Sequence, residues 1–338
     1  MRSGCWWCGA LRCESGARPI RGWGDVKIIG AVDIGGTKIA VGAVREDGAV
    51  LARAEVPTAT GRGFTAAMQD TGGMLREVLR RVDGAYAGIG VACPGPLDPF
   101  TGILGTVGTL PGWEGGEIAA ALEAQLGTGV VVENDADAAA LAEANWGVAK
   151  RSSRFLYVTV STGIGVGMVF SGELYRGVDG AHPEAGHHVI DPSGPRCYCG
   201  ARGCWESLAS GPAMAAWMGQ QRPEAGEWDA ARICELAREG DELTRSAVER
   251  VGYYIGLGLA NLITIFAPDT VAIGGGMMKS ADLFLPRVRD TIREIATQVP
   301  FEKTCITLPS LGPDAGLAGA ALGWVRRCRP TSNGHPRL

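Results

Sequence analysis

The sequence lacks any apolar run long enough to cross a bilayer and any cluster of positive charge. Its longest strongly apolar stretch, residues 255–267, falls short of the roughly 20 residues that a spanning helix needs. The formal net charge is −4, and no run of Lys and Arg stands out. The first 25 residues contain arginines but no continuous apolar segment typical of a signal peptide. We therefore expect a cytoplasmic protein with no membrane span and no broad nucleic-acid surface.

Histidine is also scarce, with four residues in 338, whereas cysteine is not, with ten. The apolar share of 46% is ample for a sizeable core. Disulfides are disfavoured in the reducing compartment that we expect, so the cysteines need another explanation. Cys93 ends an apolar run and is typical of a small core residue. Cys197, Cys199 and Cys204 lie within eight positions of one another, and this clustering predicts a specific role.

Residues 1–25 show no sustained helical or strand period. They contain a C-x-x-C pair, Cys5 and Cys8, which could bind metal or carry out redox chemistry. No second pair follows at a zinc-ribbon spacing, and no βαβ pattern surrounds it. We expect this segment to be a disordered extension, or residues read from an upstream start codon.

From residue 26 onward, strand patterns alternate with helical ones. Two segments are typical of β-hairpins with glycine-rich turns, at 26–44 and 155–170. Buried strands are expected at 87–92, 129–133 and 270–273 and a further strand at 304–308. Helices are expected at 65–82, 116–126, 136–146, 243–267, 281–297 and 314–327. This alternation predicts an α/β protein with sheets covered on both faces. Because each half opens with a glycine hairpin, we expect an internal duplication and two related domains facing a cleft.

The first glycine turn, Asp33–Lys38, joins two strands and is therefore neither a Walker A loop nor a Rossmann turn. Glycines allow backbone N–H groups to approach a bound anion. Thr37 and Lys38 add a hydroxyl and a positive charge, and Asp33 could hold a metal ion directly or through water. A single Gly-Gly pair would fit a plain hairpin equally well. A second glycine hairpin at Ser161–Gly167 and the run Gly274-Gly275-Gly276 favour a nucleotide cleft.

A catalytic carboxylate is expected at Asp135, which follows a buried strand and opens a helix. Phosphoryl transfer depends on positioning and charge stabilisation, with a carboxylate accepting the proton of the attacking hydroxyl. The alternative is that Asn134-Asp135 is only a helix N-cap, since Asn and Asp are both favoured there. The spacing alone does not decide between these interpretations.

A set of zinc ligands is indicated by the three clustered cysteines and a nearby histidine. Three thiolates and one imidazole complete a tetrahedral zinc site, and a closed set of this kind is structural rather than catalytic. Three free cysteines in a loop are the alternative. His182, His187 and His188 are the histidines available to complete the set.

These motifs, in this order, resemble those of the ROK family, which comprises sugar kinases and sugar-sensing repressors with an actin-like ATPase (ribonuclease H-like) fold. The resemblance rests on Asp33–Lys38, Pro94-Gly95, Glu133-Asn134-Asp135-Ala136, Ser161–Gly167 and Ala272–Gly276, and it covers residues 27–327. It implies a small α/β domain at 26–133, joined by the C-terminal helix 314–327, and a large α/β domain at 134–313 with a zinc-braced loop.

The resemblance also implies roles for individual residues. Asp135 is then the general base. Residues of the two hairpins bind phosphate: Asp33, Gly35, Gly36, Thr37, Lys38, Thr162, Gly163 and Gly165. The glycines 274–276 border adenosine. Asn134, Glu184, His187 and Glu206 contact the sugar. The segment Glu184–His187 resembles the family signature, which makes His187, with Cys197, Cys199 and Cys204, the zinc set and leaves His182 and His188 as ordinary polar residues.

The implied function is phosphorylation of a free hexose to its 6-phosphate by ATP and Mg²⁺, with glucose as the first substrate and a structural Zn²⁺. Fructose, mannose, allose and N-acetylated amino sugars stay open as substrates, because Thr109 stands where the family often has a sugar-binding Asn. A non-catalytic sugar-sensing regulator is the other alternative. The family resemblance also implies a homodimer that binds a small-molecule sugar, whereas the expectation of no nucleic-acid partner rests on the negative net charge and the lack of Lys and Arg runs.

Overall fold

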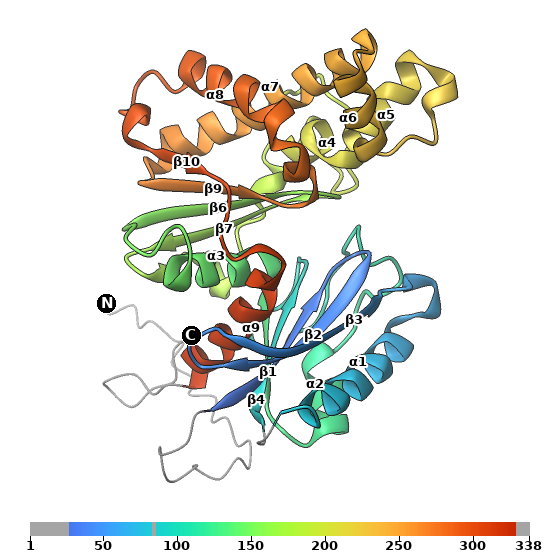
Figure 1. The fold of residues 1–338 in the computed structure, drawn as a ribbon, viewed down its shortest axis with the longest axis vertical. Helices are drawn as coiled ribbons and strands as arrows, with labels where there is room; N and C mark the ends of the chain where they lie inside the picture. Colours follow the sequence, from blue (N-terminus) through green and yellow to red (C-terminus); the bar gives the residue numbers. More distant parts are fainter. Residues whose placement is uncertain (1–26, 83–85, 329–338) are drawn as a thin grey trace, which may run out of the picture.

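The computed structural model describes residues 27–82 and 86–328. The expected extension at 1–25, with Cys5 and Cys8, lies outside these residues. Two five-stranded sheets form two lobes, one above the other in Figure 1. Within the described residues, no helix is both long and apolar enough to cross a membrane.

The first sheet is built around a glycine hairpin. Its strands are β1 (Ile28–Ile34), β2 (Lys38–Arg45), β3 (Val50–Pro57), β4 (Tyr86–Cys93) and β5 (Val130–Asn134), in the order β3-β2-β1-β4-β5. β1, β2 and β3 pair antiparallel, whereas β4 and β5 run parallel to β1. The carboxyl ends of β1, β4 and β5 therefore meet at one edge of the sheet.

The second sheet repeats this plan. Its strands are β6 (Arg154–Val160), β7 (Ile164–Phe170), β8 (Glu173–Leu174), β9 (Thr270–Gly274) and β10 (Cys305–Thr307), in the order β10-β9-β6-β7-β8. β6 and β7 form an antiparallel hairpin, and β9 runs parallel to β6 as β4 does to β1. The repeat is consistent with the expected duplication.

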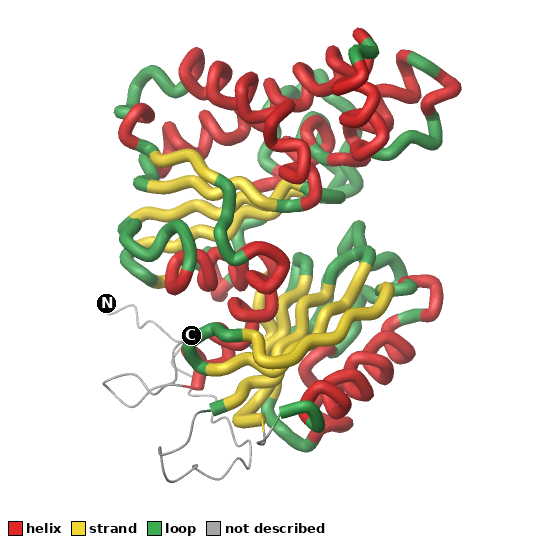
Figure 2. The backbone as a smooth tube through the Cα atoms, in the orientation of Figure 1, coloured by secondary structure: helices red, strands yellow, loops and turns green. Residues whose placement is uncertain are grey.

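Helices cover both sheets (Figure 2). On the first sheet, α1 (Phe64–Leu79) and α2 (Ile118–Leu126) cover one face. Between the sheets lie α9 (Ala315–Cys328), on the first, and α3 (Asp135–Trp146), which packs on both α9 and the second sheet. The outer lobe contains α4 (Trp205–Ala209), α5 (Gly211–Gln221), α6 (Ala230–Glu239), α7 (Glu242–Phe266) and α8 (Ala281–Ile295).

Two glycines allow α9 to lie close to its neighbours. A Cβ added at Gly90 of β4 would lie 1.8 Å from the carbonyl oxygen of Ala320 in α9. A Cβ added at Gly319 of α9 would lie 1.8 Å from the carbonyl oxygen of Ala138 in α3. Such distances exclude a side chain, so the backbones of β4, α9 and α3 are in direct contact. The C-terminal helix thereby joins the first sheet to the start of the second half of the chain.

The expected α/β fold is confirmed, and most expected elements are present within a few residues. The strands β3 and β8 and the helices α4, α5 and α6 were not expected. β3 lies at the edge of its sheet and has no fully buried residue, so its apolar signal is weak. α5 begins with Gly-Pro, which suggests a loop, although proline is accepted in the first turn of a helix. The domain limits at 133 and 313 stay a prediction.

Candidate active site

A cavity of about 270 Å³ lies between the two lobes and is lined by residues of both glycine hairpins. Its walls contain thirteen of the site residues that the sequence predicts: Asp33, Gly35, Gly36, Thr37, Lys38, Asn134, Asp135, Thr162, Gly163, Gly165, Glu184, His187 and Glu206. These residues span more than half of the chain and come together because both glycine hairpins and the carboxyl end of β5 open toward the same space.

Asn134 and Asp135 divide the tasks that the sequence left undecided. Asn134 is the N-cap of α3, and its Oδ1 accepts hydrogen bonds from the backbone N–H groups of Ala136 at 2.9 Å and Asp137 at 3.2 Å. Asp135 is the first residue of the helix, and its carboxylate lines the cavity. Its Oδ1 accepts a bond from its neighbour's N–H at 2.8 Å. Asp135 is therefore not needed as the cap.

The environment of Asp135 makes its carboxylate a stronger base than a solvated one. Desolvation in the cavity wall raises the pKa of Asp135 from 3.8 to about 6. The N–H of Ala136 and the imidazole of His182 oppose this rise, while Glu184 adds to it. A carboxylate with a pKa near 6 is ionised at neutral pH and still takes up a proton readily, which suits a general base.

Asp33 lies near the end of β1 in the same cavity. Desolvation, reinforced by the charge of Asp135, raises the pKa of Asp33 to about 7, against the opposing effect of Lys38 and Arg53. The carboxylate lies against the first turn of α9, since a Cβ added at Gly316 would lie 2.2 Å from Oδ2. The carboxylate oxygens of Asp33 are of the kind that a divalent cation such as Mg²⁺ prefers as ligands.

Lys38 is held by residues that the sequence did not predict. Its Nζ lies 3.0 Å from Oε2 of Glu55, which also binds Arg53 at 2.7 Å. Arg53 in turn lies 3.1 Å from Asp314, just before α9. Arg53 and Glu55 belong to β3, the edge strand that the sequence pattern did not show. Their spacing on one face of a strand was the available signal.

The two glutamates on the far side of the cavity approach closely because glycines face them. Glu206 Oε2 accepts a hydrogen bond from the N–H of Ile164 at 2.9 Å, and a Cβ added at Gly163 would lie 2.5 Å from the same oxygen. A Cβ at Gly95 would lie 2.7 Å from Oε1 of Glu184 and 3.2 Å from Nδ2 of Asn134. Carboxylate oxygens and an amide N–H group thus line this part of the wall together.

Thr109, which departs from the family pattern, also lines the cavity. Among the described residues its buried Oγ1 has no hydrogen-bond partner. A buried hydroxyl without a partner is costly unless a ligand or water completes it.

The four predicted zinc ligands lie together beside this cavity. One ligand atom from each of His187, Cys197, Cys199 and Cys204 falls within 4.8 Å of the others. Nδ1 of His187 lies 3.5 Å from Sγ of Cys197, and Sγ of Cys199 lies 3.5 Å from Sγ of Cys204. Tetrahedral zinc with bonds of about 2.3 Å separates its sulfurs by about 3.8 Å, so the donor set fits zinc.

The remaining nitrogen of His187 connects this cluster to the cavity. Its Nε2 lies 3.1 Å from the hydroxyl of Tyr198, and both side chains line the cavity wall. Gly203 allows the chain to turn between the ligands, because it has φ +69° and a Cβ there would lie 1.5 Å from the carbonyl oxygen of Asp191. The cluster therefore positions the wall of the cavity.

A second cavity of about 450 Å³ adjoins the first through Thr37, Ser161 and Thr162, which line both. Its other walls come largely from α5, α6 and the turn after β9: Gly211, Pro212, Ala215, Asp229, Ala230, Ala231, Cys234, Gly276, Met277, Lys279 and Ser280. This mostly apolar space adjoins the two glycine turns and is a candidate site for the nucleoside part of a nucleotide.

Of the triple glycine, only Gly276 lines that second cavity. A Cβ at Gly274 would lie 2.6 Å from the hydroxyl of Tyr157. Gly275 has φ +92°, and its Cβ would lie 2.4 Å from the carbonyl oxygen of Val160. Gly274 and Gly275 are therefore required for the close packing of β9 on β6, and the structure places neither in the cavity wall.

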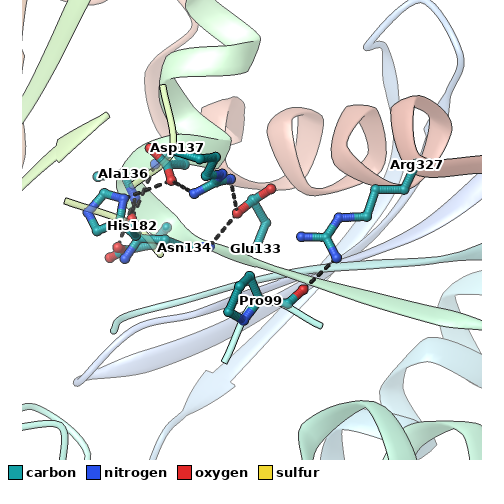
Figure 3. A network of polar contacts seen from close by, with 9 residues as sticks. Pro99, Glu133, Asn134, Ala136, Asp137, His182 and Arg327 are labelled. Atoms are coloured by element: carbon teal, nitrogen blue, oxygen red, sulfur yellow. Dashed lines mark hydrogen bonds and ion pairs between the residues drawn. The ribbon is translucent and has the colours of Figure 1, made fainter. Parts of the chain in front are cut away.

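His182 differs from the sequence interpretation as an ordinary polar residue. Its side chain is 8% exposed, lines the first cavity, and binds Oδ2 of Asp137 through Nδ1 at 2.7 Å (Figure 3). No spacing in the sequence relates residues 137 and 182, so only the folded chain shows the pair. His188 instead binds the carbonyl oxygen of Ala185 and packs against Trp205, away from the cavity wall.

The ROK family model matches residues 29–327. The glucokinase of Thermotoga maritima is 32% identical over 310 residues, which cover 88% of this chain and 96% of the relative. A crystal structure of a ROK glucokinase from Streptomyces griseus, in complex with glucose and AMPPNP, has a TM-score of 0.76 and 30% identity over 87% of this chain and 98% of that one. The xylose repressor of Bacillus spizizenii is 32% identical over 236 residues, 70% of this chain and 57% of the repressor.

A duplicated α/β fold whose hairpins open on two joined cavities, with such relatives, defines an ATP-dependent sugar kinase of the actin-like ATPase class. The chain belongs to the ROK family.

Proposed function

We propose that this kinase transfers the γ-phosphoryl group of ATP to the 6-hydroxyl of a free hexose, with glucose as the first candidate and Asp135 as the general base. The observation that supports this most is the position of Asp135. Its carboxylate lines the sugar-sized cavity, is relieved of helix capping by Asn134, and has a pKa raised to about 6.

The sugar would lie against Asn134, Glu184, His187 and Glu206. The carboxylates accept hydrogen bonds from sugar hydroxyls, Nδ2 of Asn134 donates one, and the unpartnered Oγ1 of Thr109 can complete the set. Asp135 then accepts the proton of the attacking hydroxyl as its oxygen bonds to phosphorus and ADP leaves. Glucokinases among the relatives support glucose as the substrate.

The triphosphate would extend from the first cavity to the second, past the two glycine hairpins. Thr37, Lys38 and backbone N–H groups of these turns would face the phosphates. Asp33 would hold Mg²⁺, directly or through water, and bound Mg²⁺ supplies positive charge that neutralises the phosphates. The second cavity would then bind adenosine, with Gly276 in its wall.

His187, Cys197, Cys199 and Cys204 would hold a structural Zn²⁺ through Nδ1 and three thiolates. The ion would fix the loop that has Glu184 near one end and Glu206 near the other. It would therefore affect catalysis by holding these two glutamates in position.

A sugar-sensing regulator without turnover is the second candidate, because a xylose repressor is among the relatives. The presence of Asp135 and of residues from both glycine hairpins in the wall of one cavity favours the kinase. From the family resemblance we also propose a homodimer, and from the negative net charge without basic runs we propose that the chain binds no nucleic acid. Light scattering tests the first proposal and a DNA-binding assay tests the second.

The experiment is a coupled ADP-release assay with ATP and Mg²⁺ on a panel of glucose, mannose, fructose, allose, N-acetylglucosamine and N-acetylmannosamine. We expect glucose to give the highest kcat/KM, and the product to carry phosphate on O6. Sugar binding by calorimetry with no turnover on any sugar would favour the regulator instead.

A further inference from the structure

His182 belongs to a buried chain of charged groups directly behind the proposed base. Asp137, two residues after Asp135 on α3, is fully buried and accepts hydrogen bonds from His182 and from Arg176. Arg176 also binds Oε1 of Glu133 at the end of β5. Figure 3 shows His182 beside Asn134 and Asp137. Of the residues in this network, His182 and Asn134 line the cavity.

The contact with Asp137 determines how the imidazole ring is used. A carboxylate accepts hydrogen bonds, so Nδ1 of His182 carries the proton in the 2.7 Å contact. The ring orientation is fixed by this bond, as in sites where a carboxylate orients a histidine. Nε2 has no hydrogen-bond partner among the described residues, while the ring lines the same cavity as Asp135 and Glu184.

The charges around His182 favour a protonated ring. Asp137 and Glu184 face it and raise its pKa, while desolvation, the largest single influence, and Arg176 oppose this rise. Asp135 also lies within its field, since the imidazole lowers the pKa of that carboxyl. The net shift of the pKa of His182 is upward, which favours the ring form in which Nε2 carries an N–H group that can donate into the cavity.

The cavity has an excess of acceptors for such a donor to complement. Asp33, Asp135, Glu184 and Glu206 all present carboxylates to it. A sugar hydroxyl that donates its proton to one of them still has oxygen lone pairs, and these can accept from a cationic donor. A donor beside Asp135 would therefore fix the rotation of the sugar hydroxyl as well as the position of the sugar ring.

We propose that His182 is a sugar-binding residue, whose Nε2 hydrogen-bonds one hydroxyl of the substrate next to Asp135, and that Asp137 and Arg176 are positioning residues for its ring. This inference rests on the proposed function of the cavity as the sugar site. Asp137 itself touches no substrate, because its carboxylate is fully buried behind the imidazole.

Two substitutions separate the two nitrogens. In His182→Asn the side-chain amide stands close to the position of Nδ1 and can keep the bond to Asp137, while the group that reaches into the cavity is lost. In His182→Gln the amide reaches toward the position of Nε2 and the bond to Asp137 is lost. His188→Asn is the matched control, because His188 is a neighbouring half-buried histidine outside the cavity wall.

The measurement is the Kd of the best sugar and of its single deoxy analogues, by calorimetry on the zinc-loaded full chain without ATP. We expect His182→Asn to weaken binding of the parent sugar by about 10- to 100-fold, the usual effect of losing one hydrogen bond to a charged group. One deoxy analogue should bind the wild type as weakly as the parent sugar binds His182→Asn. The Kd of that analogue should not rise further in the variant. His188→Asn should bind the parent sugar and each deoxy analogue with the Kd values of the wild type. His182→Gln should bind the parent sugar more tightly than His182→Asn does.

Turnover on the same proteins provides the second readout. With saturating sugar we expect kcat of His182→Asn to fall less than about fivefold, because the base is still present, while KM follows Kd. The inference would be overturned if removing each hydroxyl of the sugar raised Kd by the same factor in His182→Asn as in the wild type, whatever the melting temperature of the variant. If that variant does not fold, the same cycle with His182→Ala, which also lacks the group at the position of Nε2, decides. Failure of the proposed function is distinguished by a wild type that binds sugar without turnover.

Discussion

Oε2 of Glu206 accepts a hydrogen bond of 2.9 Å from the backbone N–H of Ile164, at the start of β7. Glu206 follows the last proposed zinc ligand, Cys204, by two residues and lies in the short helix α4. Ile164 belongs to the second glycine hairpin, which lines both cavities. The proposed zinc loop, the sugar wall and the phosphate hairpin are therefore connected through one carboxylate.

Loss of zinc should therefore weaken sugar binding as well as stability. We expect Cys199→Ser to lower zinc content below one per chain, to lower the melting temperature, and to raise the sugar Kd by about tenfold, since a lost structural ligand loosens the loop. Elemental analysis, thermal unfolding and calorimetry measure the three. Cys305→Ser is the control, because Cys305 is exposed in β10 and outside the cluster. Full sugar affinity in zinc-free protein would contradict this prediction.

Gly163→Ala should disturb the same connection from the opposite side. The added Cβ would lie 2.5 Å from Oε2 of Glu206 and must displace this carboxylate. We expect the sugar KM to rise by about tenfold, a loss typical of one displaced hydrogen bond. Gly61→Ala is the matched control, since a Cβ there meets nothing within 4 Å and the backbone does not require glycine. Equal sugar KM values in the two variants would contradict a role for the close approach.

Asp135→Asn keeps the size of the side chain and leaves the cap at Asn134 in place. We expect kcat to fall on the order of 10²–10⁴-fold, the usual contribution of a general base. Sugar binding should survive in part, because Asn134, Glu184 and Glu206 are unchanged. Steady-state kinetics and calorimetry on the folded variant measure these two effects. A near-normal kcat on its best sugar would remove Asp135 from the mechanism.

The pH dependence of the reaction should follow the same carboxyl. A general base must be ionised before it can accept a proton, and the pKa of Asp135 is raised to about 6. We therefore expect kcat/KM to rise with pH up to about 6 and to level off above it. Rate profiles between pH 5 and 8 measure this, with saturating coupling enzymes at each pH. A flat profile across pH 6 would show that another step limits the rate.

Stability should depend on pH in the opposite direction to activity. The pKa of Asp33 rises from 3.8 to about 7 on folding, so between these values the folded chain holds a proton that the unfolded chain has lost. The contribution of Asp33 to stability is therefore lost as the pH rises from about 4 through 7. Asp33→Asn should remove this penalty and stabilise the protein at pH 8, by on the order of 2 kcal/mol, in buffer without Mg²⁺ or nucleotide. Denaturant unfolding at pH 5 and pH 8 tests it, and a variant equally or less stable than wild type at pH 8 would contradict it.

Local chemistry made much of the fold accessible to sequence reasoning. The two glycine hairpins, the buried strands and the long helix α7 carry their own apolar periods and breakers, and the structure has these elements within a few residues. Likewise, three cysteines and one histidine in one short loop predicted that they bind a common metal ion. In the structure their ligand atoms lie close together, within 4.8 Å. These signals lie in short segments, where a few neighbouring residues determine the backbone.

Only the tertiary structure showed the contacts between residues that are distant along the chain. The edge strand β3 has no buried face, so its apolar pattern did not predict a strand, and only the folded chain shows that Glu55 pairs with Lys38. The triple glycine looked like one motif, yet close packing on Tyr157 and Val160 requires Gly274 and Gly275, and only Gly276 lines a cavity. The sequence did not distinguish His182 from an ordinary polar residue, whereas in the structure it pairs with Asp137. Burial and charge pairing depend on neighbours that are distant along the chain, so the local sequence does not show them.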